Sequence, residues 1–524
     1  MRAFVGEYNK EVRGSFKKMP KSVAIYDCTL RDGEQTPGVS FKKEEKLRIA
    51  RQLDKLGVDY IEAGFPINTK PEFEAVKEIA GMGLSAKISG LARVIREDMD
   101  ACIDAGVSMV HVFVSTSDIH LKYQIQKTRS EVYELAVNSV SYVKEHGLEC
   151  LFSPMDATRT DFDYLVKVCK GVEEAGADAI NIPDTVGVLN PPATRHLISR
   201  ITERVKVPVH IHCHNDFGLA VANSLAAVEG GARGVHVTVN GMGERAGNAS
   251  LEQVVMSLHA LYGVKTNVKS KCLTETSVLV EQLSEVQLPP FYPIVGKNAF
   301  AHESGIHAHA VLKKAETFEP LVPEDVGQKR RIVIGKHSGK ASIERALSDL
   351  GYRVEGETLL EITRRIKETA EAKKRIYDED IIAIAEDVLG HGKREPFVVL
   401  DEVTVVTGNK VTPTASVVLK YEGETIKGAS QGVGPVDAAA NAIQAIIGAD
   451  TKVKLMEYNL RAITGGTDAL ADVTIKIQDE RRNVFQANAV DDDIVMASVD
   501  ALLRAINEAI SYRKRMKSKG ETKR

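Results

Sequence analysis

The chain has 524 residues and a mass of 57.2 kDa, and because ordinary domains run about 100–250 residues, at least two folded units are expected. Apolar residues make up 43% and charged residues 27%, a mixture typical of globular proteins that excludes general disorder. The 69 basic and 72 acidic side chains give a formal charge of −3, so no global charge attracts nucleic acid or an anionic membrane.

Cysteine usage and hydropathy indicate a cytoplasmic protein. The six cysteines are scattered, without a CxxC pair, and a chain of this size needs no disulfide staples. The basic N-terminus lacks a continuous apolar core, and no stretch of about 18 apolar residues occurs. We therefore expect neither export nor membrane insertion.

Residues 22 to about 261 repeat one theme: a short β-branched run, a loop, and an amphipathic helix ending in Gly or Gly-Ala, as helix C-termini favour. The runs are SVAIYDCTL, DYIEAGFP, AKISGLAR, MVHVFVST, ECLFSPMD, AINIPDT, VPVHIHCHND and RGVHVTVNG. Eight alternations predict a (β/α)8 TIM barrel over residues 22–285, after an N-terminal extension of residues 1–21. A doubly wound sheet is the alternative, but no GxGxxG follows the first strand.

After the barrel, the predicted pattern of helices and strands changes twice. Residues 286–392 predict a mostly helical extension that contains one basic strand, QKRRIVIGKHSGK. Residues 393–516 predict a regulatory α+β domain of two similar halves, and each half is expected to have two strands and a helix. The first helix begins at GVGPVD and the second at AVDDD, and the segment leading into the second helix, QANAVDDD, is expected to be a loop. Aspartates at these helix starts satisfy free backbone amides. The charged tail, residues 517–524, is expected to fray.

Reactive side chains of a TIM barrel lie at the C-terminal ends of its strands. The first strand ends in TLRDGEQTPG, so Arg31 and Asp32 emerge at the barrel mouth together, although an Arg–Asp pair alone is equally typical of a structural ion pair. The seventh strand reads VPVHIHCHND, and strand alternation places His210, His212 and His214 on one face. Imidazoles from one strand with a carboxylate from another are a usual ligand set for a divalent metal.

The loop after the eighth strand, VNGMGERAGNAS, adds a fourth candidate ligand. Asn248 can offer an amide oxygen, while Glu244 and Arg245 can brace the other ligands. A mixed oxygen and nitrogen set does not distinguish Mn, Mg and Zn, so the metal stays open.

Several motifs resemble one known family. The segments TLRDGEQTPGVSF, HCHNDFGLA, NGMGERAGNASLEQ and FAHESGIH, in this order, resemble the acyl-CoA-dependent 2-oxo-acid condensing enzymes, namely 2-isopropylmalate, citramalate and homocitrate synthases. GPVDAAANAI and DDDIVMAS resemble the regulatory domain of the isopropylmalate and citramalate synthases. The resemblance covers nearly the whole chain beyond the N-terminal extension.

The resemblance implies a role for several residues in a Claisen-type condensation followed by thioester hydrolysis. It makes four residues ligands of a metal that holds the 2-oxo acid: Asp32, His212, His214 and Asn248. Arg31 would neutralise charge on the ketone oxygen, and His307, supplied by the extension, would help move a proton of the acetyl group. Thr185 matches a substrate-binding threonine, and Ser153 and Asn181 are assigned to the same substrate pocket.

Two positions depart from the family pattern. The fifth strand of the family ends in a serine, a variable residue and a glutamate, whereas here Met155 follows Ser153 and Pro154. Asp156 is adjacent but points the other way by strand alternation. Phe318 stands where the family usually has a tyrosine. These changes predict a retuned reaction, an inactive relative, or a site rescued by neighbours, with Glu303 as the catalytic candidate beside His302 and Glu34.

The members of this family differ in the side chain of the 2-oxo acid that they accept. EAGFPINTKPEFEAV and INIPDTVG resemble the isopropylmalate synthases most closely, which implies 2-oxoisovalerate, leucine biosynthesis, a homodimer and leucine as allosteric effector. Citramalate or homocitrate formation and a non-catalytic regulatory role are the alternatives. Homocitrate synthases need a cation for a distal carboxylate, but Arg93 and Arg159 are expected to pair with carboxylates such as Asp156 and Asp184.

Overall fold

The computed structural model describes residues 3–372, 376–389, 396–421, 423–448, 452–462 and 470–521. The chain forms two compact units, one of Met1–Ala301 with Glu319–Arg330 and the other of His302–Phe318 with Arg331–Arg524. The sequence-based boundaries at residues 21, 285, 392 and 516 stay predictions. Across the described ranges no helix is both long and apolar enough to cross a bilayer.

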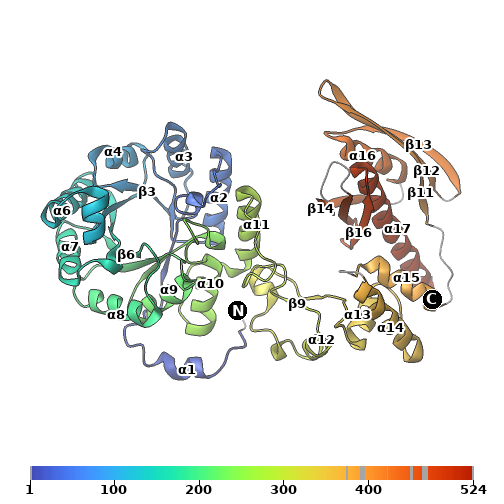
Figure 1. The fold of residues 1–524 in the computed structure, drawn as a ribbon, viewed down its shortest axis with the longest axis horizontal. Helices are drawn as coiled ribbons and strands as arrows, with labels where there is room; N and C mark the ends of the chain where they lie inside the picture. The colour runs from blue at the N-terminus through green and yellow to red at the C-terminus, as the bar shows by residue number, and fades with distance from the viewer. Residues whose placement is uncertain are drawn as a thin grey trace. The chain divides into compact units, whose positions relative to one another are not determined.

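The first unit is built around a closed barrel of eight parallel strands in sequential order (Figure 1). The strands are β1 (Ala24–Asp27), β2 (Tyr60–Glu62), β3 (Lys87–Arg93), β4 (Met109–Ser115), β5 (Glu149–Met155), β6 (Ala179–Asp184), β7 (Val209–Cys213) and β8 (Gly234–Val237). Pairing of Ala24 with Gly234 through Asp27 with Val237 joins β1 to β8 and closes the barrel. The predicted TIM barrel is confirmed.

Amphipathic helices surround the strands, as the sequence periodicity predicts. They are α2 (Lys43–Leu56), α3 (Lys70–Ala80), α4 (Arg96–Asp104), α6 (Arg129–Glu145), α7 (Phe162–Glu174), α8 (Pro191–Thr202), α9 (Ala220–Glu229), α10 (Leu251–Ser257) and α11 (Leu273–Ser284), with the short α1 (Tyr8–Arg13) and α5 (Asp118–His120). Helix α2 buries Leu47, Ala50 and Leu53 against the barrel. It ends at Gly57, whose φ of +91° is a left-handed conformation that favours glycine.

The inside of the barrel is filled by side chains, which give the mouth a solid floor. Tyr26, Cys28, Met109, Leu151 and Ala179 form a separate buried cluster there. They come from β1 and the residue after it, and from β4, β5 and β6, and their packing fills the inside of the barrel as is usual for eight strands. A substrate-sized ligand of this barrel therefore binds at its rim.

The second unit begins with the helical extension expected from the sequence. It contains α12 (Gly305–Lys313), α13 (Lys340–Asp349), α14 (Gly356–Ala372) and α15 (Asp378–Val388), and β9 (Ala301–His302) pairs with β10 (Arg331–Ile332). A buried cluster that includes Ile343, Leu347, Ile362, Ile366 and Ile381 packs these helices together. Apolar burial of this kind is the main stabilising term for such short helices.

The C-terminal part contains two antiparallel three-stranded sheets, each followed by a helix. The first has β11 (Val398–Gly408), β12 (Val411–Tyr421), β13 (Glu424–Gln431) and α16 (Pro435–Ile447), and the second has β14 (Val453–Ala462), β15 (Ala471–Asp479), β16 (Val484–Asp491) and α17 (Ile494–Glu521). The predicted two similar halves are confirmed, but the expectation of two strands in each half is wrong.

One local prediction in the second half is also wrong. The segment QANAVDDD, expected to be a loop, lies mostly in β16, where Phe485, Ala487 and Ala489 alternate into the core beneath α17. Helix α17 continues to Glu521, residues 522–524 lie outside the described residues, and fraying of the charged tail stays a prediction. A strand carrying alanines at its inward positions lets the helix approach the sheet closely, because no larger side chain intervenes.

Two helix-terminal glycines provide a matched test of packing around the barrel. Gly57 and Gly106 both have positive φ, but an added Cβ at Gly57 would lie 2.7 Å from the carbonyl oxygen of Asn267, whereas Gly106 has open space. We expect Gly106→Ala to cost about 1–2 kcal/mol from the left-handed backbone alone, and Gly57→Ala to cost clearly more. Urea unfolding of both variants measures the difference, and equal costs would contradict this packing.

Candidate active site

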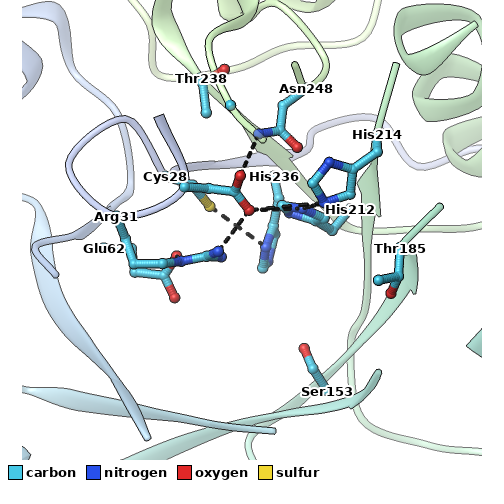
Figure 2. A network of polar contacts seen from close by, with 12 residues as sticks. Cys28, Arg31, Glu62, Ser153, Thr185, His212, His214, His236, Thr238 and Asn248 are labelled. Carbon is cyan, nitrogen blue, oxygen red and sulfur yellow. Dashed lines mark hydrogen bonds and ion pairs between the residues drawn. The ribbon is translucent and has the colours of Figure 1, made fainter. Parts of the chain in front are cut away.

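Side chains from β1, β7 and β8 meet at the C-terminal rim of the barrel (Figure 2). Asp32 follows β1, His212 lies in β7, and His214 comes directly after it. An isolated bridge between His214 and Asn248 brings the loop after β8 to the same place. Closure of the barrel between β1 and β8 is what makes these sequence-distant segments neighbours.

The carboxylate and the two imidazoles form a compact buried group. His212 Nε2 lies 3.4 Å and His214 Nε2 3.9 Å from Asp32 Oδ2, and the two Nε2 atoms are 3.2 Å apart. All three residues are buried, with exposed fractions of 2–8%. Their ligand atoms lie within 4.8 Å of one another, as a shared metal ion requires. The prediction that these residues meet is confirmed.

Asn248 completes a donor set that fits a divalent metal. Its Nδ2 donates to Asp32 Oδ1 at 2.9 Å and to the Met242 carbonyl at 3.1 Å. Its Oδ1 is buried without a hydrogen-bond partner, which is costly unless another group binds there. Burial and the charge of His212 lower the pKa of His214 to about 4, so its imidazole is neutral near pH 7, the form that ligates metals.

Arg31 is the cation that neutralises two carboxylates of the rim, Asp32 and Glu62. Its guanidinium contacts Asp32 Oδ2 through NH1 and Glu62 Oε2 through Nε, both at 2.6 Å. Burial would raise the pKa of Asp32, but Arg31 and the hydrogen bond from His212 outweigh it and hold the pKa well below its usual range. Burial likewise opposes ionisation of Glu62, yet Arg31 and His111 lower its pKa to about 2. Both carboxylates are therefore ionised beside the cation.

A buried hydrogen-bond network extends from Glu62 across the mouth. His111 donates from Nδ1 to Glu62 Oε1 at 2.5 Å, and its Nε2 lies 2.6 Å from Ser153 Oγ. Asn181 Nδ2 donates to the same Ser153 oxygen at 2.8 Å, which leaves the serine hydroxyl to donate to His111. The network brings Ser153 and Asn181 together, as predicted, and connects them to Asp32 through Arg31.

Sequence reasoning missed Glu62 and His111. Glu62 ends β2 in DYIE, so the strand-end rule that selected Asp32 could have found it. His111 lies in the middle of β4, MVHVFVS, where a single polar residue in an apolar run resembles an ordinary core histidine. Only its hydrogen bonds to Glu62 and Ser153 reveal its place in the network.

Asp156, the residue next to Met155, does not replace the carboxylate that the family usually has at position 155. Asp156 is buried in a left-handed conformation with φ of 62°, and its carboxylate accepts from Ser117 Oγ and from Arg159 Nε at 2.9 Å. Its backbone N–H donates to Thr185 Oγ1 at 2.9 Å. The prediction that Asp156 does not substitute at position 155 is consistent with these contacts, and Asp156 instead orients Thr185.

The other arginines near the rim have carboxylate partners. Arg93 pairs with Asp98 at 2.7 Å, and Arg159 pairs with Asp156. Arg245 pairs with Asp216 at 2.8 Å and also donates to the carbonyl oxygen of Thr185. The expected role of Glu244 and Arg245 in bracing the metal ligands stays a prediction.

Glu303 and His307 belong to the second unit. His307 is exposed in the first turn of α12, and its ring stacks on Phe318 with centroids 4.0 Å apart and an interplanar angle of 26°. A Cβ added at Gly335 would lie 2.5 Å from Glu303 Oε1, so a larger residue there would require this carboxylate to move. The predicted approach of these two side chains to a barrel mouth stays a prediction.

The barrel and its rim define the class: a TIM-barrel protein with a carboxylate, imidazole and amide donor set, a candidate metal site, at the C-terminal end of the strands. Three family models match successive parts of the chain. They are described as HMGL-like over residues 22–280, homocitrate synthase post-HMGL domain-like over residues 294–374, and LeuA allosteric (dimerisation) domain over residues 375–510.

Curated relatives match along nearly the whole length. The chain is 56% identical over 498 residues, 95% of it and 100% of the relative, to a probable 2-isopropylmalate synthase of Methanopyrus kandleri. It is 51% identical to the 2-isopropylmalate synthase of Methanocaldococcus jannaschii (97% and 99% covered) and 49% identical to the (R)-citramalate synthase CimA of the same organism (93% and 99%). The chain belongs to the family of 2-isopropylmalate and citramalate synthases.

The metal site can be tested by removing one imidazole. We expect His212→Ala to weaken manganese binding at least about 100-fold, because even an outer partner of a ligand is worth about 10–100-fold. Isothermal titration of metal-stripped protein measures the affinity. His196→Ala, an exposed histidine on α8, is the matched control and should bind as the parent does. Unchanged affinity in the His212 variant would exclude this metal site.

Proposed function

We propose that the protein catalyses a metal-dependent Claisen-type condensation of acetyl-CoA with a 2-oxo acid, with 2-oxoisovalerate as substrate and 2-isopropylmalate as product. The observation that carries this proposal is the donor set at the barrel rim, in which Asn248 Oδ1 is buried without a hydrogen-bond partner and Arg31 pairs with Asp32. Identity of 51–56% to proteins named 2-isopropylmalate synthase supports the choice of substrate and a role in leucine biosynthesis.

The residues of the rim have two proposed roles: four of them hold the metal, and Arg31 stabilises negative charge. Asp32, His212, His214 and Asn248 would hold Mn, Mg or Zn, which supplies Lewis acidity for the ketone and carboxylate oxygens of the acid. The pKa of Arg31 is raised by its two carboxylate neighbours even though burial opposes this, so its cation persists at any working pH. It stabilises negative charge that grows on the ketone oxygen.

The neighbouring strands hold the 2-oxo acid. Because Thr185 Oγ1 already accepts the Asp156 N–H, its own proton is available to the substrate carboxylate. Asn181 Oδ1 is buried without a partner, so it offers an acceptor inside the same pocket. Ser153 is fixed between His111 and Asn181, and the pocket is therefore preorganised before substrate binds.

His307, with Glu303 nearby in sequence, is the proposed proton-transfer pair. A proton leaves the acetyl methyl group, the new carbon–carbon bond forms at the ketone carbon, and the ketone oxygen becomes a hydroxyl. Water then cleaves the thioester to give a carboxylate and free CoA thiol. Stacking on Phe318 fixes the plane of the His307 ring, which helps general acid–base catalysis by holding its nitrogens in one direction.

The C-terminal domain is proposed to form a homodimer and to bind leucine, supported by the match to the LeuA allosteric (dimerisation) domain. Acidic side chains lie at both helix starts. Asp493 accepts the Val495 and Met496 N–H groups of α17, whereas Asp437 in the first turn of α16 accepts the N–H of Val433, which precedes that helix. Leucine would therefore bind elsewhere in this domain or displace one of these carboxylates.

Met155 favours a second candidate function. A thioether cannot accept a proton where the family usually has a glutamate, and the protein is also 49% identical to an (R)-citramalate synthase. Formation of citramalate from pyruvate, or of homocitrate from 2-oxoglutarate, is therefore the alternative to isopropylmalate formation, and a non-catalytic regulatory subunit is the third reading.

Restoring the family residues separates these functions. If the protein is a weakened isopropylmalate synthase, Met155→Glu, alone or with Phe318→Tyr, should raise CoA release with 2-oxoisovalerate at least about tenfold, since acid–base assistance is worth about 10²–10⁴-fold. A thiol assay with several 2-oxo acids measures this, with Met456→Glu, a half-exposed methionine on β14, as control. Loss of an activity on another acid would mean that Met155 and Phe318 are adaptations to it, and no activity in any variant would favour the non-catalytic reading.

Deleting residues 395–524 tests the regulatory assignment. We expect basal condensation to remain measurable, while inhibition by leucine disappears, because the effector site is removed and the barrel is retained. Activity with and without leucine and the mass in solution are the measurements. A truncated protein that stays folded and leucine-sensitive would contradict the assignment.

A further inference from the structure

A second group of potential ligands lies inside the barrel, next to the first. Cys28, His212 and His236 are buried, with exposed fractions of 0%, 6% and 1%. One ligand atom of each lies within 4.8 Å of the others, and Cys28 Sγ is 3.9 Å from His236 Nδ1 (Figure 2). The group contains one thiol and two imidazoles, and it shares His212 with the rim site.

Strand register explains why these three side chains meet. His212 of β7 is paired with His236 of β8, and the Cys28 N–H donates to the Val237 carbonyl at 2.8 Å. His212 and His236 thus lie side by side on β7 and β8, and Cys28, the first residue after β1, is held against β8 by its backbone hydrogen bond. Two of the three side chains are positioned by strand pairing, and the third belongs to the first residue after a strand.

The neighbours of His236 orient it as a ligand. His236 Nε2 lies 3.4 Å from His210 Nδ1, and its ring stacks on Tyr26 with centroids 4.1 Å apart. When Nε2–H donates to His210, the lone pair of Nδ1 is directed at the thiol of Cys28. Metal-binding histidines usually have such a partner on the second ring nitrogen, which fixes the tautomer and the ring orientation.

We propose that Cys28, His212 and His236 form a second, thiophilic metal site, suited to zinc-like cations, whose occupation excludes a metal from the rim site. Thiolate and imidazole ligands select zinc-like ions, whereas the carboxylate and amide oxygens of Asp32 and Asn248 also suit manganese and magnesium. Exclusion follows because both groups use His212, and because two dications so close repel strongly where a buried imidazole is their common ligand. The chain thereby distinguishes soft from hard metals by the site each one takes.

Cobalt tests the sulfur ligand directly, because cobalt bound to a thiolate shows an intense charge-transfer absorption in the near ultraviolet. Reduced, metal-stripped full-length protein should show this band on titration with Co²⁺. Cys28→Ser should reduce it at least about tenfold, since a direct ligand is worth no less than an outer one. Cys169→Ser, a buried thiol among apolar residues of α7, should keep it.

Two rim variants separate the sites. His214→Ala should keep the cobalt band while losing manganese binding, Cys28→Ser should keep manganese binding, and His212→Ala should lose both. Excess Mn²⁺ should diminish the band in the parent protein if occupation is exclusive. A band unaffected by saturating manganese would overturn the exclusion.

The parent protein alone can also refute the site, in case Cys28→Ser does not fold. Absence of the band in folded parent protein at saturating Co²⁺, or an X-ray absorption spectrum of the zinc-loaded protein without a sulfur neighbour, would overturn the proposal. Persistence of the band in a folded Cys28→Ser variant would do the same.

Discussion

The buried Arg31 cation between Asp32 and Glu62 is the interaction on which the rim depends. A charged group removed from water is stable only when it is paired and hydrogen-bonded, and Arg31 meets both carboxylates at 2.6 Å. These contacts tie the loop after β1 to the end of β2. They also determine where Asp32 stands relative to the imidazoles of β7, so the geometry of the metal site follows from one charge balance.

The buried charges around Arg31 also favour the protonation states that metal binding needs. Asp32 and Glu62 are held ionised, while burial keeps His214 neutral with a pKa of about 4. A carboxylate and a neutral imidazole are the forms that bind metal without first releasing a proton. The rim is therefore ready for a cation near pH 7, and ligand binding need not rearrange the charges around it.

Strand and helix periodicity predicted the barrel and the meeting of Asp32, His212 and His214, because both depend on regular local geometry. Strand β13, ETIKGASQ, was missed since it lacks apolar alternation, and β16 was missed because small alanines take its inward positions. His111 was missed because its partner, Glu62, comes from a different strand. Patterns along the chain reveal which face is buried, but contacts between strands decide which polar residues act together.

The continuous network from Asp32 through Arg31, Glu62 and His111 to Ser153 and Asn181 has a thermodynamic consequence. If a bound metal changes the affinity of the substrate pocket by some factor, the substrate must change the affinity for the metal by the same factor, since coupling free energies are reciprocal. With positive coupling, a higher substrate concentration would raise the metal occupancy of the rim, and a higher metal concentration would raise the occupancy of the substrate pocket.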